Sequence, residues 1–194
     1  LLETWVTAYG YQDSIESLFV NLKFEEAEGW GECAPAPLPL YNAEYTKGAF
    51  AVARDVMAPQ VLGKEISSSD QLQSIFHRFK GHEFARSAFD SAWWDAYALA
   101  SNKPLWSLIG GVNQTISVGA DIPVLSSTMA LIDRISEAVD QGYPRVKLKF
   151  NRSCSFKMIE QVRNTYPDLV MHIDCNSGFA LDDIELFRKL DRLN

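Results

Sequence analysis

Two lysines separated by a single residue are the strongest chemical signal in the sequence. Lys147 and Lys149 lie in a run typical of a β-strand, Arg145–Phe150. Because side chains alternate along a strand, both lysines share one face and the apolar residues of the run take the other. If helices cover that apolar face, both ammonium groups point to the interior of a sheet or barrel, where burial and mutual repulsion lower their pKa values. Such a lysine can act as a base near neutral pH. The alternative is an edge strand with two solvated lysines.

A carboxylate ends the next expected strand. Asp174 is the last residue of the run Leu169–Asp174, and Asn176 follows in a turn. Since active sites of α/β barrels lie at the carboxyl ends of the strands, Asp174 and the two lysines form a site-like group. A hard cation such as Mg²⁺ suits the carboxylate, but it needs more oxygen ligands than Asp174 and Asn176 supply. The alternative is an aspartate that caps the turn into a helix.

A regular alternation of elements positions these residues. Periodicity predicts strands at 116–122, 145–150 and 169–174, and helices at 131–139, 156–166 and 181–193. Ser155 is a candidate N-cap of the second helix. This βαβαβα order predicts a parallel sheet, the first three units of a (β/α) barrel. Three units do not close a barrel, so the chain looks truncated and its outer strands are expected to be unpaired edges.

The first part of the chain follows a different pattern. Strands are expected at 16–24 and 30–33, a Pro-rich extended stretch at 34–39, and helices at 42–62, 70–79 and 84–100. The change of pattern near Gly111 predicts two domains: an α+β domain over residues 1–112 and a partial barrel domain over residues 113–194. The fold class is therefore α/β with an N-terminal α+β domain.

Composition narrows the class of protein. The chain has 194 residues, 47% of them hydrophobic, and a formal net charge of -7. Such a chain can form a core, which excludes disorder. The acidic balance argues against nucleic acid as a partner, and no apolar run is long enough for a membrane span. The three cysteines form no CxxC pair, which favours a reducing compartment, the cytoplasm. Cys175 is expected to point away from the site and to pack as a small apolar residue.

Five motifs in order resemble the enolase superfamily. Within it the chain is most similar to the muconate-lactonizing-enzyme subgroup, in the branch of o-succinylbenzoate synthase and N-succinylamino acid racemase. The resemblance covers essentially the whole chain. Its motifs are Gly29-Trp30-Gly31-Glu32-Cys33-Ala34-Pro35, Ser87–Asp95, Pro104–Gly111, the lysine pair and Asp174-Cys175-Asn176.

The resemblance implies a capping domain that chooses the substrate and a modified barrel that carries the chemistry. Lys149 matches the general acid/base lysine and Lys147 its companion. Asp174 matches the first of three Mg²⁺ carboxylates, with Mn²⁺ as an alternative metal. Asn176 matches the asparagine of an Asp-x-Asn motif and is expected to bind the substrate. The other two carboxylates and an opposing lysine would come from later strands.

Two loops would close over the barrel and contact the substrate, again by resemblance. They are the loops around Tyr9–Ser14 and Pro37–Tyr45, and Tyr9 and Tyr41 are the expected contacts. An aromatic ring with a hydroxyl group suits such a role.

The implied activity is that of a Mg²⁺-dependent lyase of the o-succinylbenzoate synthase type, in menaquinone biosynthesis. It would remove the proton α to a carboxylate of a small-molecule substrate and eliminate water. Alternatives are an N-acylamino acid racemase, a muconate cycloisomerase-like enzyme, and a non-catalytic fragment or degenerate homologue. A homo-oligomer is left open.

Overall fold

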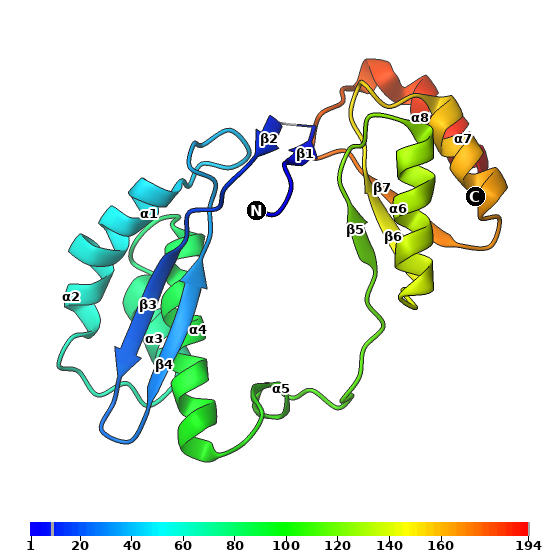
Figure 1. Ribbon diagram of the computed structural model, residues 1–194. Coiled ribbons are helices and arrows are strands. Elements are labelled where there is room, and N and C mark those ends of the chain that lie inside the picture. The colour runs from blue at the N-terminus through cyan, green and yellow to red at the C-terminus, as the bar shows by residue number, and fades with distance from the viewer. Residues whose placement is uncertain (9, 194) are drawn as a thin grey trace. The chain divides into compact units, whose positions relative to one another are not determined.

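The computed structural model describes residues 1–8 and 10–193. By its internal contacts the chain divides into two compact units, Ile15–Gln114 and Leu1–Ser14 with Thr115–Asn194. The first is an α+β unit and the second holds a parallel sheet with its helices (Figure 1). The expected fold class is therefore confirmed. No helix of the described residues is long and apolar enough to cross a membrane.

A two-stranded antiparallel sheet and one long helix form the centre of the α+β unit. Strands β3 (Leu18–Lys23) and β4 (Glu28–Cys33) pair in register, and α4 (Glu83–Ser101) packs against them. Alternate residues of β4 are buried, and two of these are Gly29 and Gly31. A Cβ atom at Gly31 would lie 1.8 Å from the carbonyl oxygen of Ala88 in α4. Glycine is therefore required for the close approach of strand and helix.

Shorter helices complete this unit. They are α1 (Thr46–Val52), the π-helical turn η1 (Ala53–Met57), α2 (Ala58–Val61), α3 (Ser69–Phe76) and α5 (Leu105–Leu108). The helix expected at 42–62 starts four residues later than predicted and contains the π-helical turn. The core includes Met57, Leu72, Phe76 and Phe89. The single turn α5 was not predicted.

The second unit contains the expected strand–helix alternation. Its elements are β5 (Ala120–Ile122), α6 (Thr128–Asp140), β6 (Arg145–Lys149), α7 (Phe156–Thr165), β7 (Val170–Asp174), η2 (Leu181–Asp183), α8 (Ile184–Leu190) and η3 (Asp191–Leu193). The three strands are parallel in the order β5-β6-β7. Ser155 caps α7 by accepting the Met158 N–H, as predicted.

Two details of this unit differ from prediction. The first strand covers only Ala120–Ile122 rather than 116–122, and Ile116 is exposed. The helix expected at 181–193 is an α-helix between two short 3₁₀ segments. The predicted alternation in β6 is confirmed, because Val146, Leu148 and Phe150 are buried in the core between the sheet and α6 and α7.

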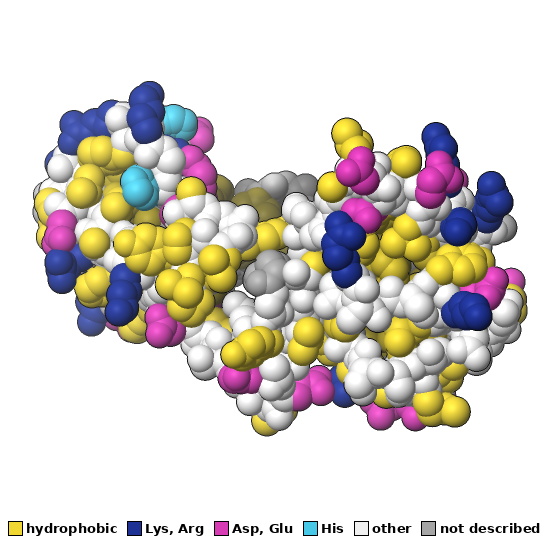
Figure 2. Space-filling view, turned by 90° about the horizontal axis from the view of Figure 1, so that it is seen from above, with side chains coloured by type: hydrophobic (Ala, Val, Ile, Leu, Met, Phe, Trp, Pro, Cys, Tyr) yellow, Lys and Arg dark blue, Asp and Glu magenta, His cyan; other side chains and the backbone are white. Residues whose placement is uncertain are grey.

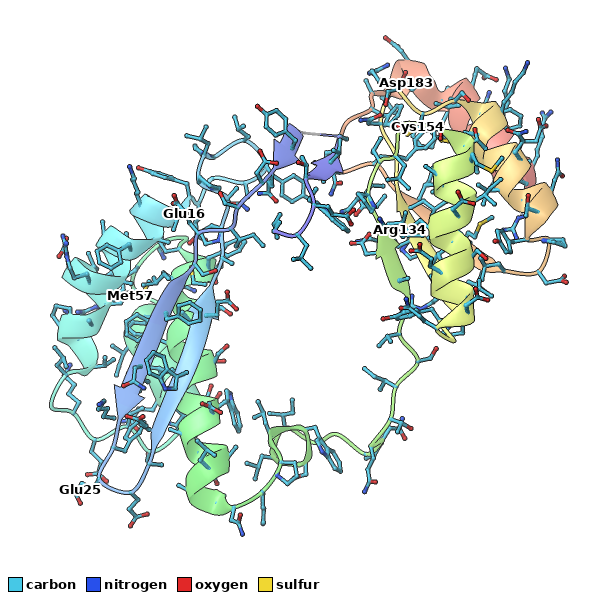
Figure 3. The ribbon with its side chains drawn as sticks, in the orientation of Figure 1. Glu16, Glu25, Met57, Arg134, Cys154 and Asp183 are labelled. Atoms are coloured by element: carbon cyan, nitrogen blue, oxygen red, sulfur yellow. The ribbon has the colours of Figure 1, made fainter. Side chains whose placement is uncertain are left out.

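Residues 1–14 pack with the second unit. They form a hairpin of β1 (Trp5–Thr7) and β2 (Gly10–Gln12), where a loop was expected at 9–14. The Val124 N–H donates to the Val6 carbonyl at 3.1 Å, and Arg134 of α6 donates two hydrogen bonds to the Glu3 carboxylate. Figure 3 labels Arg134. The expected first domain began at residue 1, whereas the compact α+β unit begins at Ile15.

Candidate active site

The site begins with the polar face of β6. Lys147 and Lys149 alternate with the buried residues of this strand. Their side chains therefore lie on the face of the sheet opposite the core. The Lys149 side chain is only 9% exposed and that of Lys147 is 29% exposed. Burial of an ammonium group is costly unless acidic or polar groups surround it. Both lysines therefore need partners on the neighbouring strands.

Asp174, at the end of β7, is the shared partner of the two lysines. It lies opposite Lys149 in the register of the parallel pair. The Lys149 Nζ donates a hydrogen bond to Asp174 Oδ2 at 2.8 Å, and the Lys147 Nζ lies 3.4 Å from the same oxygen. The Lys149 hydrogen bond, helped by the N–H of Asn176, outweighs burial and lowers the pKa of Asp174 to about 2. The carboxylate is therefore ionised at neutral pH.

A second carboxylate, Asp121 of β5, belongs to the same group and was not predicted. It lies opposite Lys147 in register, and its Oδ2 is 2.8 Å from the Lys147 Nζ. Asp121 was the only charged residue in the strand expected at 116–122, and its parity places it away from the buried Ile122. That charge within an apolar run was the signal that could have identified it.

The pair of carboxylates changes the expected charge state of one lysine. Burial lowers the pKa of Lys147, but the hydrogen bonds and charges of Asp121 and Asp174 raise it more, so the pKa of Lys147 lies above its usual value. The expectation of a lowered pKa is wrong for this lysine, because the two carboxylates outweigh its burial and its cationic neighbour.

Asn176 lies beside Asp174 but outside the strand. The strand ends at Asp174, and Asn176 and Ser177 both adopt left-handed backbone conformations, with φ of 43° and 59°. The Asn176 N–H donates to Asp174 Oδ1 at 2.9 Å, while its own Oδ1 is buried and has no hydrogen-bond partner in the described structure. A buried amide oxygen without a partner is a candidate acceptor for a ligand.

The loop after β6 is fixed at the same end of the sheet. Asn151 Oδ1 accepts hydrogen bonds from the N–H and the hydroxyl of Ser153 at 2.9 and 2.6 Å. Arg152 donates two hydrogen bonds to the carboxylate of Asp183, the last residue of η2 and the N-cap residue of α8. Figure 3 labels Asp183 and Cys154. These contacts hold the chain immediately beyond Lys149 in one conformation.

The remaining predicted residues have different outcomes. Tyr41 lies in the α+β unit, in the segment before α1, and its side chain is about half exposed. Tyr9 lies outside the described residues. Their contact with a substrate stays a prediction. Cys175 packs against the hydrophobic core of the parallel-sheet unit, as predicted. Burial and the charge of Asp174 raise its pKa.

The donor set fits one part of a magnesium site. Asp174 supplies an ionised carboxylate and Asn176 an uncommitted amide oxygen, which are the hard ligands that Mg²⁺ prefers. No group of three or more His, Cys, Asp or Glu side chains that could hold a metal ion occurs within residues 1–8 and 10–193. A Mg²⁺ ion bound through Asp174 would need further ligands from elsewhere.

The surface around the units carries charges of both signs. In the space-filling view, basic and acidic side chains are intermixed with hydrophobic ones on each unit (Figure 2). Asp121, Lys147, Lys149 and Asp174 therefore differ from the other charged side chains in their regular pairing across the strands and their partial burial, and not in charge alone.

Comparison with known families matches the α+β part of the chain. Residues 5–110 match the model of the mandelate racemase / muconate lactonizing enzyme N-terminal domain. This match covers more than half of the chain.

Individual relatives match nearly all of the chain. It is 32% identical over 193 residues to an o-succinylbenzoate synthase of Listeria innocua, and 30% identical over 187 residues to an N-succinylamino acid racemase of Thermus thermophilus. These alignments cover 99% and 96% of this chain but 52% and 51% of the relatives. The chain thus spans about half the length of the curated relatives it matches.

A solved structure has the same fold. The crystal structure of an enolase superfamily member from Listeria innocua superimposes with a TM-score of 0.91 at 31% sequence identity. The match covers 99% of this chain and 52% of that one.

Proposed function

Because the chain belongs to the mandelate racemase / muconate lactonizing enzyme family of the enolase superfamily, we propose that it carries the base and the first metal carboxylate of an enzyme that removes the proton α to a carboxylate. The finer activity we propose is that of a Mg²⁺-dependent o-succinylbenzoate synthase, which acts in menaquinone biosynthesis.

One contact carries the proposal. The Lys149 Nζ lies 2.8 Å from Asp174 Oδ2, and both groups are largely shielded from solvent at the carboxyl ends of adjacent parallel strands. A base beside a carboxylate that could hold a cation suits α-proton removal, because the new negative charge must be stabilised where it forms. Two surface lysines would offer neither the carboxylate nor the burial.

The residues then have separate roles. Lys149, as the neutral amine, takes the α-proton at its Nζ. Lys147 keeps its positive charge and stabilises the anion that develops on the substrate carboxylate. Asp174 would hold a cation, and the amide oxygen of Asn176 would bind the cation or the substrate. When bound, Mg²⁺ would act as a Lewis acid that stabilises the doubly negative enediolate.

A racemase is the second candidate. It is supported by the N-succinylamino acid racemase of Thermus thermophilus, whose identity to this chain is nearly that of the synthase relative. Both activities begin with the same proton removal. They differ in the following step, which is loss of a hydroxyl group in the synthase and return of the proton to the opposite face in the racemase.

The test is removal of the base in the full-length protein. We expect Lys149→Ala to lower both α-proton exchange with solvent and turnover by roughly 10²–10⁴-fold, the usual contribution of general acid–base catalysis. Exchange is measured by NMR in D₂O with an N-succinylamino acid, and turnover with the synthase substrate. Lys157→Ala is the matched control, because Lys157 is an exposed lysine of α7. Turnover of Lys149→Ala within a few-fold of wild type would contradict the proposal.

A further inference from the structure

Four charged side chains form a row across the parallel sheet, and ion pairs link them in the order Asp121, Lys147, Asp174 and Lys149. Asp121 on β5, Lys147 and Lys149 on β6, and Asp174 on β7 are linked by three ion pairs. The register of the strands sets Asp121 opposite Lys147 and Asp174 opposite Lys149. Asp121 is the member of the row that has no role in the proposed proton removal or in metal binding.

We propose that Asp121 is a positioning residue that holds the Lys147 ammonium group on the β5 side of the site and thereby leaves Asp174 Oδ2 to Lys149 and a divalent cation. This inference rests on the proposed function, since it concerns the same site.

The distances carry the first step. The Lys147 Nζ is 2.8 Å from Asp121 Oδ2, which is hydrogen-bond distance, but 3.4 Å from Asp174 Oδ2. A lysine ammonium group is a point charge on a flexible four-carbon stem, so its partners decide where it lies. With Asp121 replaced by a neutral group, Asp174 is the carboxylate that remains within reach of Lys147 among the described residues.

The acceptor capacity of Asp174 carries the second step. Its Oδ1 accepts the Asn176 N–H and its Oδ2 accepts Lys149. A carboxylate has about four lone-pair sites in total. A second ammonium group at full hydrogen-bond distance would compete with a cation for the lone pairs that are left. Asp121 weakens that competition by holding the Lys147 Nζ 3.4 Å from Asp174 Oδ2, and it also keeps Lys147 close enough to neutralise charge on a bound substrate.

The test is a double-mutant cycle in the full-length protein, with Mg²⁺ alone as the ligand in calorimetric titration. We expect Asp121→Asn to raise the Mg²⁺ dissociation constant by about tenfold when Lys147 is present. In a Lys147→Met background the same change should have an effect of less than twofold, because the competing ammonium group is gone. Asp140→Asn, at an exposed position of α6, is the control for loss of one negative charge elsewhere.

Two results would overturn the proposal. One is an unchanged dissociation constant in Asp121→Asn. The other is an equal loss of affinity in both backgrounds, which would show that Asp121 acts through its own charge and not through Lys147.

A crystal structure of the Asp121→Asn protein gives a readout that depends neither on metal nor on turnover. The Lys147 Nζ should lie nearer to Asp174 Oδ2 than in the wild type, and an unmoved Nζ would also overturn the proposal. A wild-type protein without α-proton exchange would instead count against the proposed function, while this displacement would still test Asp121.

Discussion

At the scale of single residues, Asp174 has the most perturbed ionisation of the site, and this predicts how the stability depends on pH. Its pKa is lowered from 3.8 to about 2 by Lys149 and the Asn176 N–H, in spite of burial. A lowered carboxyl pKa stabilises the fold above the ordinary value and loses that effect as pH falls through the folded value. We expect a contribution of about 2 kcal/mol at pH 7 that disappears between about pH 4 and 2. Chemical denaturation of wild type and Asp174→Asn across this range measures it, and a stability difference that does not shrink on acidification would contradict the assignment.

The same aspartate predicts metal dependence. In the full-length protein Asp174→Asn exchanges an ionised ligand for a neutral amide, so the Mg²⁺ dissociation constant should rise by at least about tenfold. Asp168→Asn, in the turn before β7, is the matched control. An unchanged affinity in calorimetric titration would return Asp174 to the role of a turn-capping residue.

At the scale of elements, the contact between β4 and α4 depends on glycine. Gly31→Ala would place a methyl group 1.8 Å from the Ala88 carbonyl oxygen, and backbone atoms of a 19-residue helix cannot move aside as a side chain can. We expect a loss of roughly 1–3 kcal/mol or more in the free energy of unfolding. Gly48→Ala in α1 is the control, because its new methyl group meets only the ring of the exposed Tyr45. Equal stability of the two variants in thermal denaturation would contradict this account.

Elements were predicted where one physical signal dominated. Strand alternation placed the lysines of β6 correctly, because burial of Val146 and Leu148 fixes the face, and the hydroxyl of Ser155 marked the start of α7. Asp121 and the β1–β2 hairpin were missed, since their partners lie far along the chain. Asp121 pairs with Lys147, and residues 1–14 are held by Val124 and by Arg134 of α6. The π-helical turn within 46–61 has no local sequence signal that we can identify.

At the scale of the whole molecule, the parallel sheet has three strands, with β5 and β7 at its edges. Unpaired edges expose backbone donors and acceptors, and Asp174 as the single proposed metal carboxylate is too few to hold Mg²⁺ tightly. We expect residues 1–194, expressed alone, to lack turnover, to bind Mg²⁺ weakly, and to associate with the rest of the protein or with a second copy. Dehydration assays with Mg²⁺ and sedimentation velocity check this. A monomer with measurable turnover would require a complete catalytic set within this sequence.

The packing of residues 1–14 with residues 115–194 has a consequence for the order of folding. Glu3 and Arg134 are 131 positions apart, so the ribosome must release the entire α+β unit before their ion pair can form. The amino-terminal hairpin therefore lacks its contacts with the second unit through most of synthesis. The α+β unit, whose strands and helices are contiguous in sequence, can fold first. Because residues 1–14 pack with residues 115–194, a single proteolytic cut within Ile15–Gln114 need not separate the two fragments. The contacts between these two segments still join them.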